Sequence, residues 1–496
     1  MGIIFRQSIK GTIVHYFGAM IGMITVLFIQ TQFLSKEEIG LMKVLYDAGL
    51  LVSTLALLGT PSSAMRFFPY FKNDKNKDNG FFFYLLFVPA IGAVIFIPLF
   101  VLLKGVIVDF FNERLFEQYY SWVIPLILFL MYWSTFETYS NIKMRIAVPK
   151  LFREVGVRVL LLTIYVLYGF NFLTLTQLVT CAISVYGIVM IATLIYIRQF
   201  RAITVKHDIK YIDKELRTKI FRYTGFLLLT SLSTNILAQL DTFMVASIKG
   251  LYYTGIYTIV MFIASVIDMP ARSISAISAP IAADALKNNN FEKANALYKD
   301  VSLHQLIASS LIFVCIWVNI DNIFAIIPNG ESFAEGKWVV LFLGISRVIN
   351  STLNFGGILI SFSRYYYWSL FFAFFICILG ITTNLLLIPI LGITGAALAT
   401  LISCILSISV QQWIVLKKVK GNPYTVNTLK QVILILTLIG VSYLLPRWSY
   451  NPYIDIMYRT AIIGALSMFF IYKFKISKQI CNIIDKSWEK VKYKKI

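Results

Sequence analysis

About fourteen long apolar segments occupy nearly the whole chain, and most of its charged residues lie between these segments. Each segment has roughly 17–25 residues, which is long enough for a helix to cross the hydrocarbon core of a bilayer. Because a bilayer offers backbone amides no hydrogen-bond partners, such segments must be helices that satisfy their own backbone. The sequence therefore predicts an all-α polytopic membrane protein and excludes a soluble enzyme.

The composition supports this prediction. The 496 residues are 58% hydrophobic and only 14% charged, whereas soluble proteins carry nearer a quarter charged residues. The net charge of +21 would suggest nucleic acid in a soluble protein, but here the basic residues lie in connecting loops. We therefore expect no nucleic-acid partner, and we expect these loops to contact anionic membrane lipids.

The hydropathy pattern predicts fourteen spans, at residues 12–34, 39–63, 81–103, 120–140, 155–170, 176–197, 223–246, 254–279, 302–320, 337–361, 367–388, 395–416, 431–446 and 456–472. With the N-terminus placed in the cytoplasm, about 34 of the 45 lysines and arginines lie on the cytoplasmic side, which is a strong positive-inside asymmetry. An even number of spans then predicts that both termini are cytoplasmic.

A basic stretch at residues 198–222 is the longest polar interruption and separates six spans from eight. We therefore predict an N-terminal lobe at 1–200, a basic cytoplasmic linker at 201–222, a C-terminal lobe at 223–420, and two further helices with a basic tail at 421–496. Six helices per lobe would make the lobes parallel repeats about an axis normal to the membrane. Similar tetrapeptides, containing Gly40 and Gly255, open the second span of each lobe.

Residues 282–300 are predicted to form a smaller cytoplasmic element. Asn290 can cap a short helix whose apolar face would comprise Phe291, Ala294, Tyr298 and Val301. We therefore expect this helix to lie on the membrane surface.

Polar stripes run along several spans at a period near 3.5 residues, and such stripes usually face protein or water rather than lipid. The tenth span carries Arg347, Asn350, Asn354, Gly357 and Ser361, and the eighth carries Ser265, Asp268, Arg272 and Ser275. Similar stripes in the seventh and twelfth spans comprise Ser231, Thr234, Asn235, Gln239 and Asp241, and Thr400, Ser403, Ser407 and Gln411, respectively. Either these groups only join helices to one another, or they line a hydrated cavity. Four stripes in one lobe favour the cavity.

Charged residues within the spans are the candidate site residues. Arg347 lies near the middle of the tenth span with no acidic residue within a turn on its own helix, so it needs water, a partner on another helix, or an anionic substrate. Arg272 and Asp268 are four residues apart and either neutralise each other or act in the function of the protein. Lys43 and Asp47 repeat this spacing in the second span.

The acidic residues within the spans are the candidates for ion coupling. Asp241, near the end of the seventh span, is interpreted either as a coupling-ion site or as the partner of an arginine in the C-terminal lobe. Asp268 and Asp47 are the other two candidates. Glu137 and Arg158 lie near the predicted inner surface, where we expect them to be solvated.

Enzyme motifs are absent from the sequence. It has no clustered metal ligands, no glycine-rich phosphate loop and no long outer loop for a glycosyl-transfer site. We therefore expect a transporter with no catalytic residue, no metal and no cofactor, coupled to protons or sodium ions if it is coupled at all.

Short motifs from the seventh span onward resemble those of the polysaccharide-biosynthesis flippases (Wzx type) of the multidrug/oligosaccharidyl-lipid/polysaccharide exporter superfamily. They are Gln239-Leu240-Asp241, Tyr253-Thr254-Gly255-Ile256-Tyr257, residues 323–330, and residues 392–400 at the entry to the twelfth span. The resemblance implies two six-helix lobes in a V, like that of multidrug (MATE) transporters, around a cavity that opens alternately to each side. Two C-terminal helices would flank a groove for a lipid tail.

The resemblance also implies a function. Members of this family move undecaprenyl-diphosphate-linked oligosaccharides from the inner to the outer leaflet of the bacterial plasma membrane, for O-antigen-like or capsule-like polysaccharide. The implied partners are the lipid-linked oligosaccharide and polysaccharide assembly proteins, and we expect a monomer. Because the forked donors of arginine suit a diphosphate, the cavity is predicted to contain Arg347, Arg272, Asn350, Asn354 and Lys43.

Two other functions remain open at this point. A cation-coupled multidrug exporter of the same superfamily would need acidic rather than basic charge in its cavity to meet cationic drugs. A membrane polysaccharide polymerase or ligase would need a large outer loop.

Overall fold

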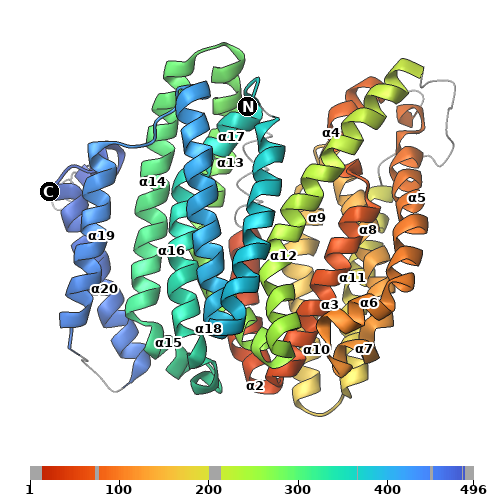
Figure 1. Ribbon diagram of the computed structural model, residues 1–496, viewed down its shortest axis with the longest axis horizontal. Coiled ribbons are helices and arrows are strands. Elements are labelled where there is room, and N and C mark those ends of the chain that lie inside the picture. Colours follow the sequence, from red (N-terminus) through yellow and green to blue (C-terminus); the bar gives the residue numbers. More distant parts are fainter. Residues whose placement is uncertain are drawn as a thin grey trace, which may run out of the picture. The chain divides into compact units, whose positions relative to one another are not determined.

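The computed structural model describes residues 14–72, 77–199, 214–365, 367–446, 451–482 and 484–485 (Figure 1). Within these residues all regular secondary structure is helical, which confirms the predicted all-α membrane fold. The chain divides into two compact units, Met1–Thr258 and Ile259–Ile496. The predicted lobe boundary at 201–222 falls mainly on residues 200–213, which lie outside the described residues, so the two-lobe division and the cytoplasmic position of both termini stay predictions.

Eleven helical stretches in the described part are long and apolar enough to cross a membrane. Two of them, Asn235–Lys287 and Trp368–Val419, are more than twice the length that a bilayer requires. Each is broken by a glycine with positive φ, Gly250 at 87° and Gly392 at 61°, a backbone conformation that residues with a Cβ rarely adopt. When both sides of each break are counted, together with the short helix α10 (Val157–Gly169), the described residues hold the fourteen predicted spans.

The first unit contains the first seven spans. Its helices are Val14–Phe33, which includes η1 (Thr25–Gln30) and α2 (Thr31–Phe33), then α3 (Lys36–Ala56), α4 (Thr60–Phe71), η2 (Lys77–Gly80), α5 (Phe81–Leu102), α6 (Lys104–Phe111), α7 (Arg114–Tyr119), η3 (Tyr120–Trp122), α8 (Val123–Ile142), α9 (Ala147–Leu151), η4 (Phe152–Gly156), α10, α11 (Leu175–Arg198) and most of α12 (Lys214–Ser265). The core of this unit lies among α3, α8 and α11, and the apolar side chains with which these helices face one another are buried.

Two glycines allow α3 and the end of α12 to cross at very short range within the first unit. A Cβ on Gly40 would lie 2.1 Å from the carbonyl oxygen of Leu251, and one on Gly255 would lie 2.0 Å from that of Lys36. The contact is reciprocal, because each glycine faces the first turn of the other helix. Small residues at such positions let helix backbones approach closely in membranes. The two similar tetrapeptides of the sequence are therefore packed against each other.

The second unit contains the remaining spans. Its elements are η6 (Val266–Asp268), α13 (Met269–Lys287), α14 (Phe291–Val318), α15 (Ile320–Ile326), η7 (Gly330–Gly336), α16 (Lys337–Leu353), α17 (Phe355–Phe362), α18 (Trp368–Ile414), η8 (Val415–Val419), α19 (Val426–Leu444) and α20 (Pro452–Lys473). Helix α16 packs between α14 and α18, and α19 and α20 pack on α14 (Figure 1).

The prediction of a separate surface helix after Asn290 is wrong. Asn290 does cap a helix, since its side chain accepts a hydrogen bond from the backbone N–H of Lys293 at 2.9 Å. However, that helix is α14, which continues without a break to Val318 as the ninth span. Most of the apolar face that suggested membrane contact is buried inside the protein instead. Tyr298 is fully buried and packs against Phe355, and of the four residues of this face only Phe291 is exposed.

Candidate functional site

Two of the predicted site residues of the second unit, Asp268 and Arg347, are in contact where η6 and α16 pack together. Asp268 ends a short 3₁₀ turn that joins α12 to α13, where Pro270 removes a backbone N–H and interrupts regular α-helical bonding. This turn places the Asp268 carboxylate next to α16. Arg347 Nη1 donates to Asp268 Oδ2 at 2.9 Å, and Ser351, one turn further along α16, donates its hydroxyl to Oδ1 at 3.1 Å.

Of the two interpretations of Asp268 and Arg272, the structure does not support the one in which they neutralise each other. The partner of Asp268 is Arg347, 79 residues away, and the side chain of Arg272 is exposed, with no ion pair among the described residues. The Arg347 side chain remains 32% exposed while that of Asp268 is 11% exposed. Of the three alternatives that the sequence left for Arg347 (water, a partner on another helix, or an anionic substrate), the structure shows the partner on another helix. Arg272 is an additional positive charge one turn along the chain from Asp268.

The two predicted asparagines lie on the same helix as Arg347. Asn350 is half-buried on α16, and Asn354 is exposed at the interruption between α16 and α17. At this interruption the backbone carbonyl of Leu353 accepts hydrogen bonds from the Tyr298 hydroxyl at 3.0 Å and the Gln412 amide at 3.0 Å. The interruption is therefore held by buried polar groups, and it leaves Asn354 accessible.

Lys43 and Asp47 form the ion pair that their spacing predicted. The Lys43 ammonium contacts both carboxylate oxygens of Asp47 at 2.7 Å, on one face of α3. Asp47 is only 1% exposed, whereas the Lys43 side chain is 22% exposed. A buried carboxylate without a partner is costly, and Lys43 supplies the compensating charge for Asp47.

Asp241 lies in the first unit, on the part of α12 that precedes the break at Gly250. The Tyr257 hydroxyl, from the other side of that break, donates to Asp241 Oδ2 at 3.0 Å. The carboxylate is half-buried. Of the stripe on this span, the side chains of Ser231 and Thr234 are not among those that the structure describes.

Sequence reasoning missed a network of charges in the first unit. Glu137 and Arg158, which were expected to be solvated, are partly exposed and are members of this network. Arg158 Nη2 lies 3.2 Å from Glu154 Oε2, and His15 Nδ1 lies 3.4 Å from the same oxygen. Glu137 is paired with Arg153 at 3.2 Å. Glu154 and Arg153 lie on η4, a π-helical turn, a feature that occurs frequently at functional sites. The four-residue spacing of Glu154 and Arg158 was the available signal.

The two clusters differ in their balance of charge. In the first unit each of the cations Lys43, Arg153 and Arg158 has a carboxylate partner. In the second unit Arg347 and Arg272 accompany one carboxylate, Asp268, within apolar helices. An excess positive charge in such a place favours an anionic ligand, because arginine donors match phosphate and carboxylate oxygens.

Comparison with known proteins identifies the family and the fold. Residues 5–284 match the model of the family described as polysaccharide biosynthesis protein. An uncharacterized membrane protein of Methanocaldococcus jannaschii is 28% identical over 206 residues, which are 41% of this chain and 48% of that protein. The chain thus spans about half the length of this curated relative.

Solved structures share the fold at low sequence identity. The lipid II flippase MurJ, in an inward closed conformation, superposes with a TM-score of 0.72 and 13% identity, covering 94% of this chain and 98% of MurJ. An inward-facing multidrug resistance transporter of the MATE family and MOP superfamily gives a TM-score of 0.58 and 14% identity, covering 82% and 95%. A MOP superfamily transporter from Pyrococcus furiosus gives 0.51 and 14%, covering 85% and 96%.

Proposed function

We propose that this chain, which belongs to the polysaccharide biosynthesis protein family, moves a lipid-linked oligosaccharide across the membrane by exposing its headgroup site to each side in turn. The proposed substrate is an undecaprenyl-diphosphate-linked oligosaccharide, transferred from the inner to the outer leaflet of the bacterial plasma membrane. The observation that carries the proposal is the cluster of Arg347, Arg272 and Asp268, in which two guanidinium groups accompany one carboxylate inside apolar helices.

The chemistry of this cluster suits a diphosphate. Asp268 orients the Arg347 guanidinium through one N–H group, which leaves further donors of the fork for a ligand. Arg272 supplies an exposed guanidinium one turn away on α13. Two such groups can hold the oxygens of adjacent phosphates, and the exposed amide of Asn354 offers a hydrogen bond to a sugar hydroxyl. A cationic drug would be repelled by the same charges, which disfavours multidrug export.

Transport of a defined substrate tests the proposal. We expect the purified full-length chain, reconstituted in vesicles, to move a fluorescent undecaprenyl-diphosphate oligosaccharide between leaflets, measured as access of the headgroup to a membrane-impermeant quencher. An undecaprenol-linked oligosaccharide without phosphate should not be moved, because it offers the arginines no anion. Protein-dependent efflux of a cationic dye, without movement of the diphosphate lipid, would instead identify a drug exporter.

Ion coupling is proposed for Asp241. Asparagine at this position keeps an oxygen to accept the Tyr257 hydroxyl but removes the charge that a proton or sodium ion would neutralise. We expect Asp241→Asn to retain basal lipid movement and to lose its stimulation by an imposed proton or sodium gradient. Asp109→Asn, which removes an exposed carboxylate on α6, is the matched control and should keep the stimulation. Unchanged gradient dependence of Asp241→Asn at equal protein level would exclude Asp241 from coupling.

A further inference from the structure

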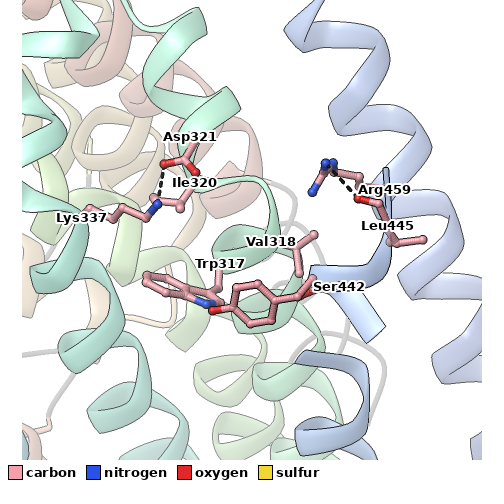
Figure 2. Close-up of a pocket in the computed structure, with 9 residues that line it drawn as sticks. Trp317, Val318, Ile320, Asp321, Lys337, Ser442, Leu445 and Arg459 are labelled. Carbon is pink, nitrogen blue, oxygen red and sulfur yellow. Dashed lines mark hydrogen bonds and ion pairs between the residues drawn. The ribbon is translucent and has the colours of Figure 1, made fainter. Parts of the chain in front are cut away.

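We propose that a pocket in the second unit binds the phosphate headgroup of an anionic membrane lipid. The pocket lies among the ends of α14, α15, α16, α19 and α20, and its volume is about 200 Å³. Figure 2 shows Lys337 and Asp321 on one side and Arg459 on another, with Trp317 below them. The proposal does not depend on what the protein transports.

The position of the pocket places it at the membrane surface. Helices α14 and α19 end beside it, at Val318 and Leu444, and α16 begins beside it at Lys337. Because each of these helices is long enough to span the bilayer, their shared end lies at the level of lipid headgroups. Arg459 lies about two turns into α20, and helical side chains point back toward the N-terminal end. Its guanidinium can therefore reach the same level.

Two cations from different helices face this pocket. Arg459 Nε donates to Asp455 Oδ2 at 2.7 Å, and Asn322 from α15 donates to the same oxygen at 2.7 Å. Asp455 is only 1% exposed and is also held by Asn322. Its hydrogen bond with Arg459 therefore fixes the orientation of the Arg459 guanidinium. Lys337 Nζ donates to Asp321 Oδ1 at 2.6 Å, at an exposed site where such a pair contributes little. An ammonium has three donors, so Lys337 can hold a phosphate oxygen as well.

Aromatic rings complete the site. Trp317 packs against Trp338 with 6.1 Å between ring centroids, and Lys337 Nζ lies 5.9 Å from the centroid of Trp317. Tyr443 lines the pocket and is 74% exposed. Tryptophan and tyrosine concentrate at membrane interfaces, where one end of the side chain is apolar and the other meets water. These rings indicate contact with the boundary between lipid headgroups and chains.

The neighbouring surface selects a lipid over a free anion. Next to the pocket, α19 and α20 expose apolar side chains, including Leu444 at 81% and Met457 at 74%. A phosphate held by Lys337 and Arg459 would leave its acyl chains free to cover this apolar surface. Inorganic phosphate would use the cations alone. Lys337 and Arg459 each have a carboxylate partner, so they bring no excess positive charge, and a phosphate would use the N–H donors that these pairs leave free. Together with the aromatic rings and the exposed apolar surface, these donors point to the headgroup of a phosphate-bearing lipid.

Lipid retention by the full-length chain tests this site. In neutral detergent, native mass spectrometry should show retention of dioleoylphosphatidylglycerol but not of dioleoylglycerol, which lacks the phosphate. We expect Lys337→Ala to weaken retention about fivefold and Lys337→Glu about thirtyfold, since each unit of charge near a lipid surface changes binding by about fivefold. Lys104→Glu changes an exposed lysine at the start of α6 and is the matched control, with retention unchanged.

The other possible outcomes of this experiment either overturn or support the proposed lipid site. Equal retention by Lys337→Glu and Lys104→Glu, with equal unfolding temperatures, would overturn it, as would equal retention of dioleoylglycerol. Displacement of phosphatidylglycerol by millimolar inorganic phosphate would reduce the pocket to a free-anion site and overturn the lipid assignment. Preferential retention of a polyprenyl diphosphate would support the lipid-phosphate site and identify the carrier lipid as its occupant.

Discussion

Replacing Arg347 by alanine is expected to abolish movement of the diphosphate-linked lipid. The change removes one of the two guanidinium groups proposed for the diphosphate and leaves Asp268 buried with only the Ser351 hydroxyl as a partner. Removing one member of a buried ion pair costs on the order of 3–5 kcal/mol, so this variant also loses stability. Transport should be measured in vesicles at equal amounts of folded protein.

Two further variants separate the binding role of Arg347 from its structural role. Arg347→Lys keeps the positive charge and the pair with Asp268 but loses the planar set of N–H donors that can bind two phosphate oxygens at once. This variant should therefore retain part of the activity. The double variant Asp268→Asn with Arg347→Gln replaces the ion pair by neutral groups of similar shape, and it should fold yet remain inactive. Transport at the wild-type rate by this double variant would make Arg347 purely structural and would move the proposed contact to Arg272 or Lys43.

A matched pair in the first unit controls for the loss of charge itself. Glu137 and Arg153 also form an ion pair between helical segments, at 3.2 Å. Glu137→Gln combined with Arg153→Gln removes the same number of charges from residues that are not part of the proposed headgroup site. We expect this control to retain transport.

Replacing Gly255 by alanine is expected to destabilise the protein strongly, because the added methyl group would lie at the crossing of α3 and α12. Its Cβ would lie 2.0 Å from the Lys36 carbonyl oxygen, a backbone atom that cannot move without shifting α3. Overpacking of this kind costs about 1–3 kcal/mol and occasionally more. The unfolding temperature in detergent and the amount of protein in the membrane should both fall, and Gly255→Leu should prevent folding.

The crossing offers its own controls. Gly40→Ala meets the Leu251 carbonyl oxygen at 2.1 Å and should have a similar effect. Gly464→Ala and Gly440→Ala add the same methyl group on α20 and α19, where nothing lies within 4 Å. Because alanine is the better helix former, these two variants should be unchanged or slightly more stable. Equal unfolding temperatures for Gly255→Ala and Gly464→Ala would contradict the close crossing.

Much of the fold follows from the sequence because it depends on local physics. A run of about twenty apolar residues has to form a helix in a bilayer whatever its neighbours are, so the spans were predictable. Pairing of Lys43 with Asp47 was predictable too, because helix geometry brings residues four apart together. The helix N-cap at Asn290 was predictable as well, because the capping hydrogen bond joins residues only three positions apart. Local spacing was not used everywhere, because the pairs Glu154–Arg158 and Asp455–Arg459 have the same four-residue spacing and were not predicted.

Contacts between helices were decided only by the tertiary structure. Asp268 had Arg272 within reach on its own helix, yet it pairs with Arg347, because the 3₁₀ turn before Pro270 directs its carboxylate to α16, where Ser351 supplies a second donor. Helix packing likewise buried the face of Tyr298 that had suggested a membrane surface. The sequence by itself determined which segments span the membrane and which residues carry charge within them. The packing of those helices decided which charges neutralise each other, because a buried carboxylate takes the partner that also completes its hydrogen bonds, whatever their separation along the chain.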